Sequence, residues 1–157
     1  MFENCLCNKY IIENILINLT ISHYLAFLVI FLIYILVKYL LKNNTMLLLF
    51  NIAGVVFHEL SHFVVALLLN GKPNFINLIP NKKEKSAGSV QVDNVTFYNK
   101  LFIGLAPLSL LFAAYYIFIQ YFISENIFLK QVILSYIIFN LILHSIPSKQ
   151  DLKIAFL

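Results

Sequence analysis

The sequence predicts an all-α polytopic membrane protein with about four transmembrane helices and a small β-hairpin in the loop 71–100. Of its 157 residues, 61% are hydrophobic and 11% are charged, whereas soluble domains have about 45–50% apolar and about 25% charged residues. The apolar residues also gather in four runs, each long enough to cross a bilayer. These properties exclude a cytosolic globular enzyme, a disordered tail and a coiled coil. We expect a single membrane-embedded domain, 1–157.

The elements follow from the apolar pattern. Residues 1–20 alternate polar groups with Ile and Leu at a spacing typical of an interfacial helix lying on the membrane. The four runs predict transmembrane spans at 22–41, 46–70, 101–124 and 127–147. The first two spans and the last two are joined by very short turns, so each pair is expected to be antiparallel.

The one substantial loop is 71–100, which opens with the helix stop Gly71-Lys72-Pro73. Short strands are predicted over 74–80 and 88–97, on either side of a polar turn, because valines alternate along the second of them. The sequence therefore predicts a β-hairpin in this loop.

The lysines predict the orientation in the membrane. All eleven basic residues are Lys, eight on the side of the termini and the 71–100 loop and three on the other. The positive-inside rule then makes the termini and this loop cytoplasmic. The four spans predict an integral, multi-pass membrane protein. Abundant Ile, Asn and Lys without Arg is typical of an AT-rich genome, so we expect the membrane to be a bacterial plasma membrane. The sequence has no stripe of basic residues of the kind that nucleic-acid-binding proteins carry, so we expect no nucleic-acid partner.

The second span contains His58-Glu59-Leu60-Ser61-His62, an HExxH sequence. Positions i and i+4 share one face of a helix, so both imidazoles can bind one Zn²⁺ ion, and Glu59 can act as general base on a zinc-bound water. Ionisable groups deep in a bilayer are costly and usually functional. Buried polar groups bonded to neighbouring helices are the structural alternative.

With these residues, the chain resembles the site-2 protease family of intramembrane zinc metalloproteases. The resemblance rests on the HELSH sequence within a span, on the hairpin-like loop that ends near Gly88, on Gly104-Leu105-Ala106-Pro107-Leu108, and on the pair Pro147 and Asp151 after the fourth span. It covers about residues 46–152, and it implies a catalytic core made of spans two to four.

The resemblance also implies the site residues. It carries over His58 and His62 as zinc ligands, Glu59 as base and Asp151 as the third ligand. The family pattern is Asn-x-x-Pro-x-x-x-Leu-Asp-Gly, and this chain departs from it. His144 stands in place of Asn, Asp151 comes one residue early, and Leu152 replaces Gly.

The position of Asp151 in the chain can be compared with this expectation. His62 lies eight residues before the end of its span, about 12 Å below that surface, and Asp151 lies on the same side. Glu125 belongs to the turn on the opposite side of the membrane, which excludes it as the third zinc ligand. Because the fourth span ends near Pro147, Asp151 is expected to lie closer to the membrane surface than the two histidines. Two features of the sequence could bring it deeper. Pro147 breaks the helix and frees the carbonyl of Leu143, and the apolar tail after Asp151 can return into the bilayer.

Other polar residues of the spans have weaker assignments. His144 can replace Asp151 as ligand, orient the substrate carbonyl or stabilise an oxyanion as the family's Asn suggests, or simply pack between helices. Asn140 is expected to form an interhelical hydrogen bond. Gly104 and Pro107 are interpreted as a close helix contact and a kink. His23 is expected at a span edge, without a ligand role.

The predicted function is that of a zinc-dependent intramembrane endopeptidase, whose partners are the lipid bilayer and a membrane-protein or peptide substrate. One alternative is a membrane-anchored zinc protease of another lineage that acts outside the bilayer, with Glu84 or Asp93 as third ligand. The other is a non-catalytic metal-binding scaffold. The substrate, its cleavage site, the oligomeric state and the roles of Cys5 and Cys7 stay open.

Overall fold

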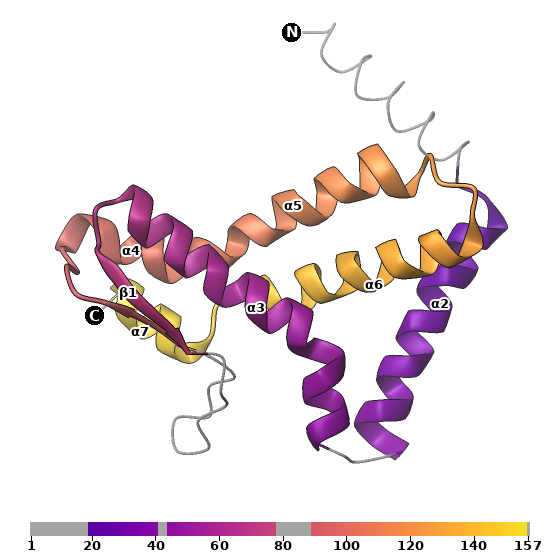
Figure 1. The fold of residues 1–157 in the computed structure, drawn as a ribbon, viewed down its shortest axis with the longest axis horizontal. Helices are drawn as coiled ribbons and strands as arrows, with labels where there is room; N and C mark the ends of the chain where they lie inside the picture. Colours follow the sequence, from indigo (N-terminus) through magenta and orange to yellow (C-terminus); the bar gives the residue numbers. More distant parts are fainter. Residues whose placement is uncertain (1–18, 41–43, 78–88, 157) are drawn as a thin grey trace, which may run out of the picture.

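The computed structural model describes residues 19–40, 44–77 and 89–156. The predicted interfacial helix 1–20 therefore lies almost wholly outside the described residues. Within them the chain is helical, with one small two-stranded antiparallel sheet (Figure 1). The main elements, in chain order, are α2 (Ile21–Ile35), α3 (Asn44–Leu68), β1 (Pro73–Asn77), β2 (Ser89–Val92), α4 (Phe97–Leu105), α5 (Ser109–Ile117), α6 (Phe128–His144) and α7 (Lys149–Phe156).

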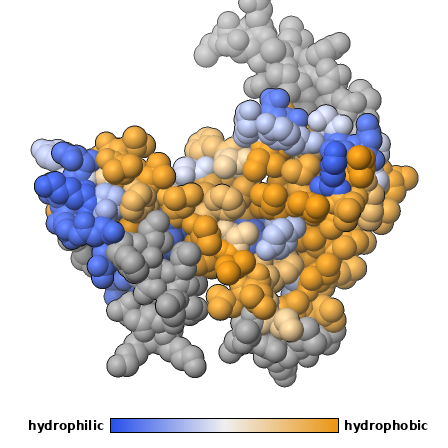
Figure 2. All heavy atoms as spheres, viewed as in Figure 1, coloured by the Kyte–Doolittle hydropathy of each residue, from blue (hydrophilic) through white to orange (hydrophobic). Residues whose placement is uncertain are grey.

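Three helical stretches of the described chain are long and apolar enough to cross a membrane: Ile21–Tyr39, Met46–Leu68 and Tyr98–Phe122. A fourth span is possible if α6 and α7, which are bent by 49° at a short break, count as one. Figure 2 shows hydrophobic side chains over most of one face, with hydrophilic ones gathered near the sheet and α7 and near the α5–α6 turn. The structure is thus of the helical membrane type that the composition predicts.

The predicted hairpin is confirmed, with shorter strands than expected. β1 and β2 pair in antiparallel register, Ile76 with Val90 and Asn77 with Ser89. The expectation of a strand up to residue 97 is wrong, because a capping box starts helix α4 there. The N–H of Thr96 donates to Asn99 Oδ1 (2.7 Å), and the N–H of Asn99 donates to Thr96 Oγ1 (3.4 Å). Residues 78–88 lie outside the described chain.

The predicted helix stop at Gly71 is also confirmed. The N–H of Gly71 donates to the carbonyl of Ala66 (2.7 Å), and that of Asn70 donates to Leu67 (3.2 Å). These two bonds form a Schellman motif, in which Asn70 takes the left-handed conformation with φ of 56°. Lys72 is left-handed as well, with φ of 52°. The chain thereby reverses directly from α3 into the sheet.

The C-terminal part differs from the prediction. The helix of the fourth predicted span, α6, ends at His144, three residues earlier than expected, and Pro147 lies in the break before α7 as predicted. The residues expected to form an apolar tail are a helix instead. Ser148 and Asp151 start this helix with a second capping box, and α7 packs against α4.

Helix α6 lies at the centre, in contact with α2, α3 and α5 (Figure 1). The core between them contains Leu110, Ala114, Phe122, Ile138 and Leu141. Asn140, expected to bond between helices, instead donates its Nδ2–H to the carbonyl of Tyr136 on its own helix (3.1 Å).

His23 lies at the edge of the first span, as predicted, in the first turn of α2, and its side chain is buried. His23 Nδ1 accepts the N–H of Thr20 (3.1 Å), and Nε2–H donates to the carbonyl of Phe122 (3.0 Å). The ring therefore caps α2 and ties it to the helical stretch that ends at Phe122.

Candidate metal centre

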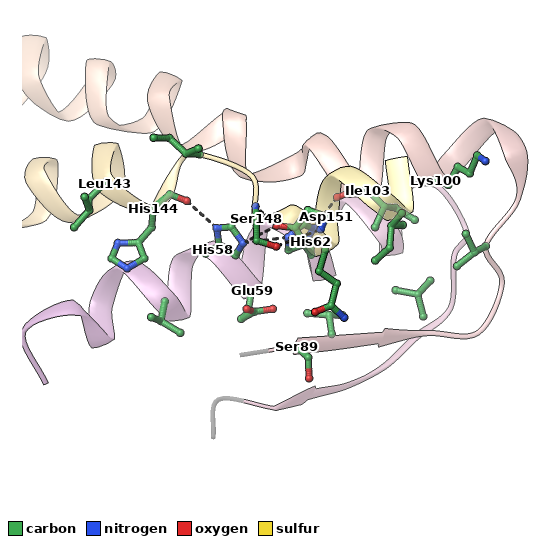
Figure 3. A pocket seen from close by; sticks show the side chains of 17 residues that line it. His58, Glu59, His62, Ser89, Lys100, Ile103, Leu143, His144, Ser148 and Asp151 are labelled. Atoms are coloured by element: carbon green, nitrogen blue, oxygen red, sulfur yellow. Dashed lines mark hydrogen bonds and ion pairs between the residues drawn. The ribbon is translucent and has the colours of Figure 1, made fainter. Parts of the chain in front are cut away.

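The two histidines of the HExxH sequence lie one turn apart on α3 and face the same way. Their Nε2 atoms are 3.3 Å apart (Figure 3). The helical period alone places both side chains on one face. The direction of each ring depends on contacts with other helices.

Asp151 reaches these histidines from α7, which the break at Pro147 turns back toward α3. Its Oδ2 lies 3.3 Å from His58 Nε2, and its Oδ1 lies 3.3 Å from His62 Nε2. The carboxylate is held by the capping box, in which the N–H of Ser148 donates to Oδ2 (2.6 Å) and the N–H of Asp151 donates to Ser148 Oγ (3.2 Å). The structure thus brings together His58, His62 and Asp151.

Backbone carbonyls fix the tautomer of both rings. His58 Nδ1–H donates to the carbonyl of His144 (2.7 Å), and His62 Nδ1–H donates to the carbonyl of Ile103 (2.6 Å). A carbonyl can only accept, so the proton of each neutral imidazole lies on Nδ1 and the lone pair lies on Nε2. Two lone pairs and a carboxylate therefore point at one place, an arrangement that repels itself unless a cation or protons are present.

The spacing of these atoms fits a zinc ion. Zinc binds His nitrogen at about 2.0–2.1 Å and carboxylate oxygen at about 2.0–2.2 Å in tetrahedral geometry, and such a tetrahedron has edges of about 3.3–3.4 Å. The two Nε2 atoms lie 3.3 Å apart, and each has its own Asp151 oxygen at 3.3 Å, Oδ2 beside His58 and Oδ1 beside His62. One ligand atom from each of the three residues lies within 4.8 Å of the others. Calcium and magnesium prefer six or more oxygen ligands, so two imidazoles favour zinc over them. These three residues would hold the ion, and three protein ligands are the number found in catalytic zinc sites, where water or substrate supplies the fourth.

Glu59 lies beside this group, with only 6% of its surface exposed. It lines a cavity of about 670 Å³ together with His58, His62 and Asp151. Figure 3 shows its carboxylate on the side of the cavity that faces the sheet. The cavity is otherwise lined mainly by aliphatic side chains, which are Val55, Val90, Val92, Val95, Ile103, Leu143, Ile146 and Ile154.

His144, the other predicted catalytic residue, lines the same cavity at the end of α6. Its Nδ1–H donates to the carbonyl of Asn140 (3.0 Å), and its own carbonyl accepts the proton of His58. In the described chain Asp151, and not the ring of His144, completes the group of three possible metal ligands. The alternative with His144 as third ligand is therefore not supported.

The carboxylates considered as rivals lie elsewhere or outside the described chain. Asp93 accepts a hydrogen bond from the side chain of Asn74 in the loop. Glu125 accepts the N–H of Ile127 (3.0 Å), which lowers the pKa of its carboxyl, and it lies 3.6 Å from Lys130. Glu84 and the two cysteines fall among the residues that are not described.

Several residues that shape the site were not found from the sequence. Gly54, one turn before His58, has the ring of His144 where a side chain would stand. Ser148 and the carbonyl of Ile103 hold two of the ligands. Ser148-Lys149-Gln150-Asp151 after a proline is itself a capping-box pattern and predicts the start of α7. The positions of Gly54 and the carbonyl depend on helix packing, which no local pattern shows.

Comparisons of the chain with protein-family models, with curated proteins and with solved structures gave no match. The functional interpretation therefore depends on the geometry of this site.

Proposed function

We propose that this protein is a zinc-dependent intramembrane endopeptidase of the site-2 protease type. The observation that supports this most is the convergence of His58 Nε2, His62 Nε2 and the Asp151 carboxylate, each 3.3 Å from the next. When both rings are neutral their protons lie on Nδ1, so this place offers three electron-pair donors and no hydrogen-bond donor. Such a set favours a metal ion over an ordinary buried hydrogen-bond network.

A bound zinc ion supplies Lewis acidity and lowers the pKa of a bound water toward about 7. Glu59 supplies the base, since it follows His58 directly, is almost fully buried and lines the same cavity. Its carboxylate takes the proton of the attacking water and passes it to the leaving amine. Burial among aliphatic side chains limits access of bulk water to the peptide under attack.

The substrate is proposed to be a transmembrane segment or a peptide near the membrane. A helix keeps its amides in internal hydrogen bonds, so the segment must unwind before a peptide bond reaches Glu59. Ser89, Val90 and Val92 of β2 line the cavity, so the sheet borders the site. We propose that the unwound segment is held there as an added strand. Because the Nδ1–H of His144 already donates to the carbonyl of Asn140, its neutral ring would orient the segment by accepting a peptide N–H at Nε2 and not through the scissile carbonyl.

Replacement of Glu59 by Gln tests the proposal. Removal of the general base is expected to lower cleavage of a transmembrane substrate in proteoliposomes by about 10²–10⁴-fold. Zinc content should stay at one ion per chain, because Glu59 is not one of the three grouped ligands. Glu125→Gln is the matched control, since Glu125 lies in the distant α5–α6 turn.

Two results would contradict the proposal. Cleavage by Glu59→Gln at the rate of the unaltered protein would show that Glu59 is not the base. Zinc bound to the unaltered protein without cleavage of any transmembrane substrate would favour a non-catalytic metal-binding scaffold.

A further inference from the structure

The carbonyl that orients His62 belongs to a break in the helical stretch of α4 and α5. In a continuous α-helix the carbonyl of Ile103 would accept the N–H of residue 107. Residue 107 is a proline and has no N–H. The chain forms a 3₁₀ turn over Ala106–Leu108 here, and the carbonyl of Ile103 accepts the N–H of Ala106 as well as the ring proton of His62.

This second bond matters because it decides which ring nitrogen of His62 carries the proton. A neutral imidazole can place its proton on either nitrogen, and the acceptor on one side selects the tautomer. The Ile103 carbonyl, 2.6 Å from Nδ1, keeps the lone pair of Nε2 directed at His58 and Asp151. Acceptors behind a ligating histidine usually contribute about 10–100-fold to metal affinity.

We propose that Pro107 is a positioning residue for the metal site, because its missing N–H leaves the carbonyl of Ile103 open to His62. This inference rests on the proposed role of His62 as a zinc ligand. Pro107 itself is buried and is not among the residues that line the cavity, so it acts through Ile103 and not by contact with a substrate.

The other histidine supports the same reading. His58 donates to the carbonyl of His144, the last residue of α6. In a continuous helix the carbonyl of His144 would accept the N–H of Ser148, but that N–H donates to Asp151 Oδ2 instead (2.6 Å). Each imidazole is thus held by a helix carbonyl whose usual i+4 partner is absent or used elsewhere.

Replacement of Pro107 by Ala tests this inference, because it restores the N–H. The new donor is expected to compete for the Ile103 carbonyl and to weaken zinc binding by about 10–100-fold, measured by competition with a chromophoric chelator. The ¹⁵N spectrum of the metal-free protein should show His62 losing its fixed Nδ1–H tautomer. Pro73→Ala, at the start of β1, is the control, with zinc affinity expected within about twofold.

A second variant separates the missing N–H from the shape of the proline ring. Lactic acid incorporated at position 107 has the side chain of Ala but an ester oxygen in place of the N–H. It should keep zinc affinity and the His62 tautomer close to those of the unaltered protein. Weakening equal to that of Pro107→Ala would overturn the inference, and so would Pro107→Ala with unchanged affinity and tautomer. In both cases the zinc site itself would stand. Failure of the unaltered protein to bind zinc would instead overturn the proposed function, and this inference with it.

Discussion

At the residue scale, the site is defined by where protons are placed. Both neutral imidazoles donate their Nδ1–H to backbone carbonyls, so the Nε2 atoms that face Asp151 have only lone pairs. Asp151 has one oxygen near each ring, and Ser148 holds the carboxylate from behind. A carboxylate in this position adds a negative charge and an electron pair that an amide cannot supply.

Replacement of Asp151 by Asn tests its role as third ligand. The amide keeps the size of the side chain and can still accept from Ser148, but it loses the charge. We expect zinc affinity to fall by at least about 100-fold, as for loss of a metal ligand. The matched variant Asp93→Asn, in the loop, should bind zinc normally when both are titrated under the same conditions. The reverse pattern would support the alternative with a ligand from the loop.

Much of this residue set could be predicted from the sequence, for reasons that are local. Two histidines at i and i+4 and the glutamate between them are brought together by the helical period alone. Asp151 required the resemblance to a protease family, because its chain separation from His58 is bridged by tertiary structure. The carbonyl of Ile103 could not be predicted, since a helix break has several possible outcomes.

At the scale of elements, the decisive one is α7. It carries Asp151 and packs against α4, where Gly104 allows close approach. A methyl group at Gly104 would lie 2.5 Å from the carbonyl oxygen of Asp151 and 2.7 Å from Ala155 Cβ. The prediction that Gly104 permits a close helix contact is therefore confirmed, although the helix it contacts was not predicted.

Replacement of Gly104 by Ala is expected to push α7 away from α4. The overpacking should destabilise the protein by about 1–3 kcal/mol, measured as a thermal shift in detergent. Zinc affinity should fall at the same time because Asp151 moves with α7. Ser109→Ala, an exposed position on the following helix α5, should change neither quantity. An unchanged zinc affinity in Gly104→Ala would show that α7 docking does not govern the site.

The left-handed residue after α3 gives an independent test of the fold. Lys72 has φ of 52°, a conformation that costs an L-residue about 1–2 kcal/mol. Gly avoids this strain but loses more chain entropy on folding, about 0.5–1 kcal/mol. Lys72→Gly is therefore expected to raise the free energy of unfolding by about 0.5–1 kcal/mol. Lys153→Gly, within α7, should lower it by about 1 kcal/mol. A loss of stability in Lys72→Gly would contradict the left-handed conformation of Lys72.

The limits of sequence prediction differ among the elements. Long apolar runs predicted the helical stretches Ile21–Tyr39 and Met46–Leu68 within about two residues, because burial in lipid needs little tertiary detail. The end of β2 and the start of α4 were misplaced, since the capping box at Thr96 overrides the strand pattern. The break after His144 was expected from Pro147, but not the helix that follows it.

At the scale of the whole molecule, the helices place the candidate site near one end and the α5–α6 turn near the other (Figure 1). The lysine distribution predicts that the end with the sheet and α7 is cytoplasmic. This orientation would let water and the loop reach the metal centre from the cytoplasm.

Single cysteines introduced after replacement of Cys5 and Cys7 by Ser test this orientation. Gln91 in β2 and Asn126 in the α5–α6 turn are both exposed. In intact cells, a membrane-impermeant thiol reagent should label Asn126→Cys, and it should label Gln91→Cys only after permeabilisation. The opposite labelling would reverse the predicted topology without affecting the geometry of the site.

The account as a whole depends on a zinc ion held by two helix-borne imidazoles and a carboxylate from the C-terminal helix. Zinc X-ray absorption of the purified protein, with metal content measured on the same sample, tests this most directly. We predict one zinc per chain with two imidazole nitrogens at about 2.0–2.1 Å and carboxylate oxygen at about 2.0–2.2 Å. Protein that stays metal-free when supplied with zinc at neutral pH, or zinc bound by sulfur, would contradict the account.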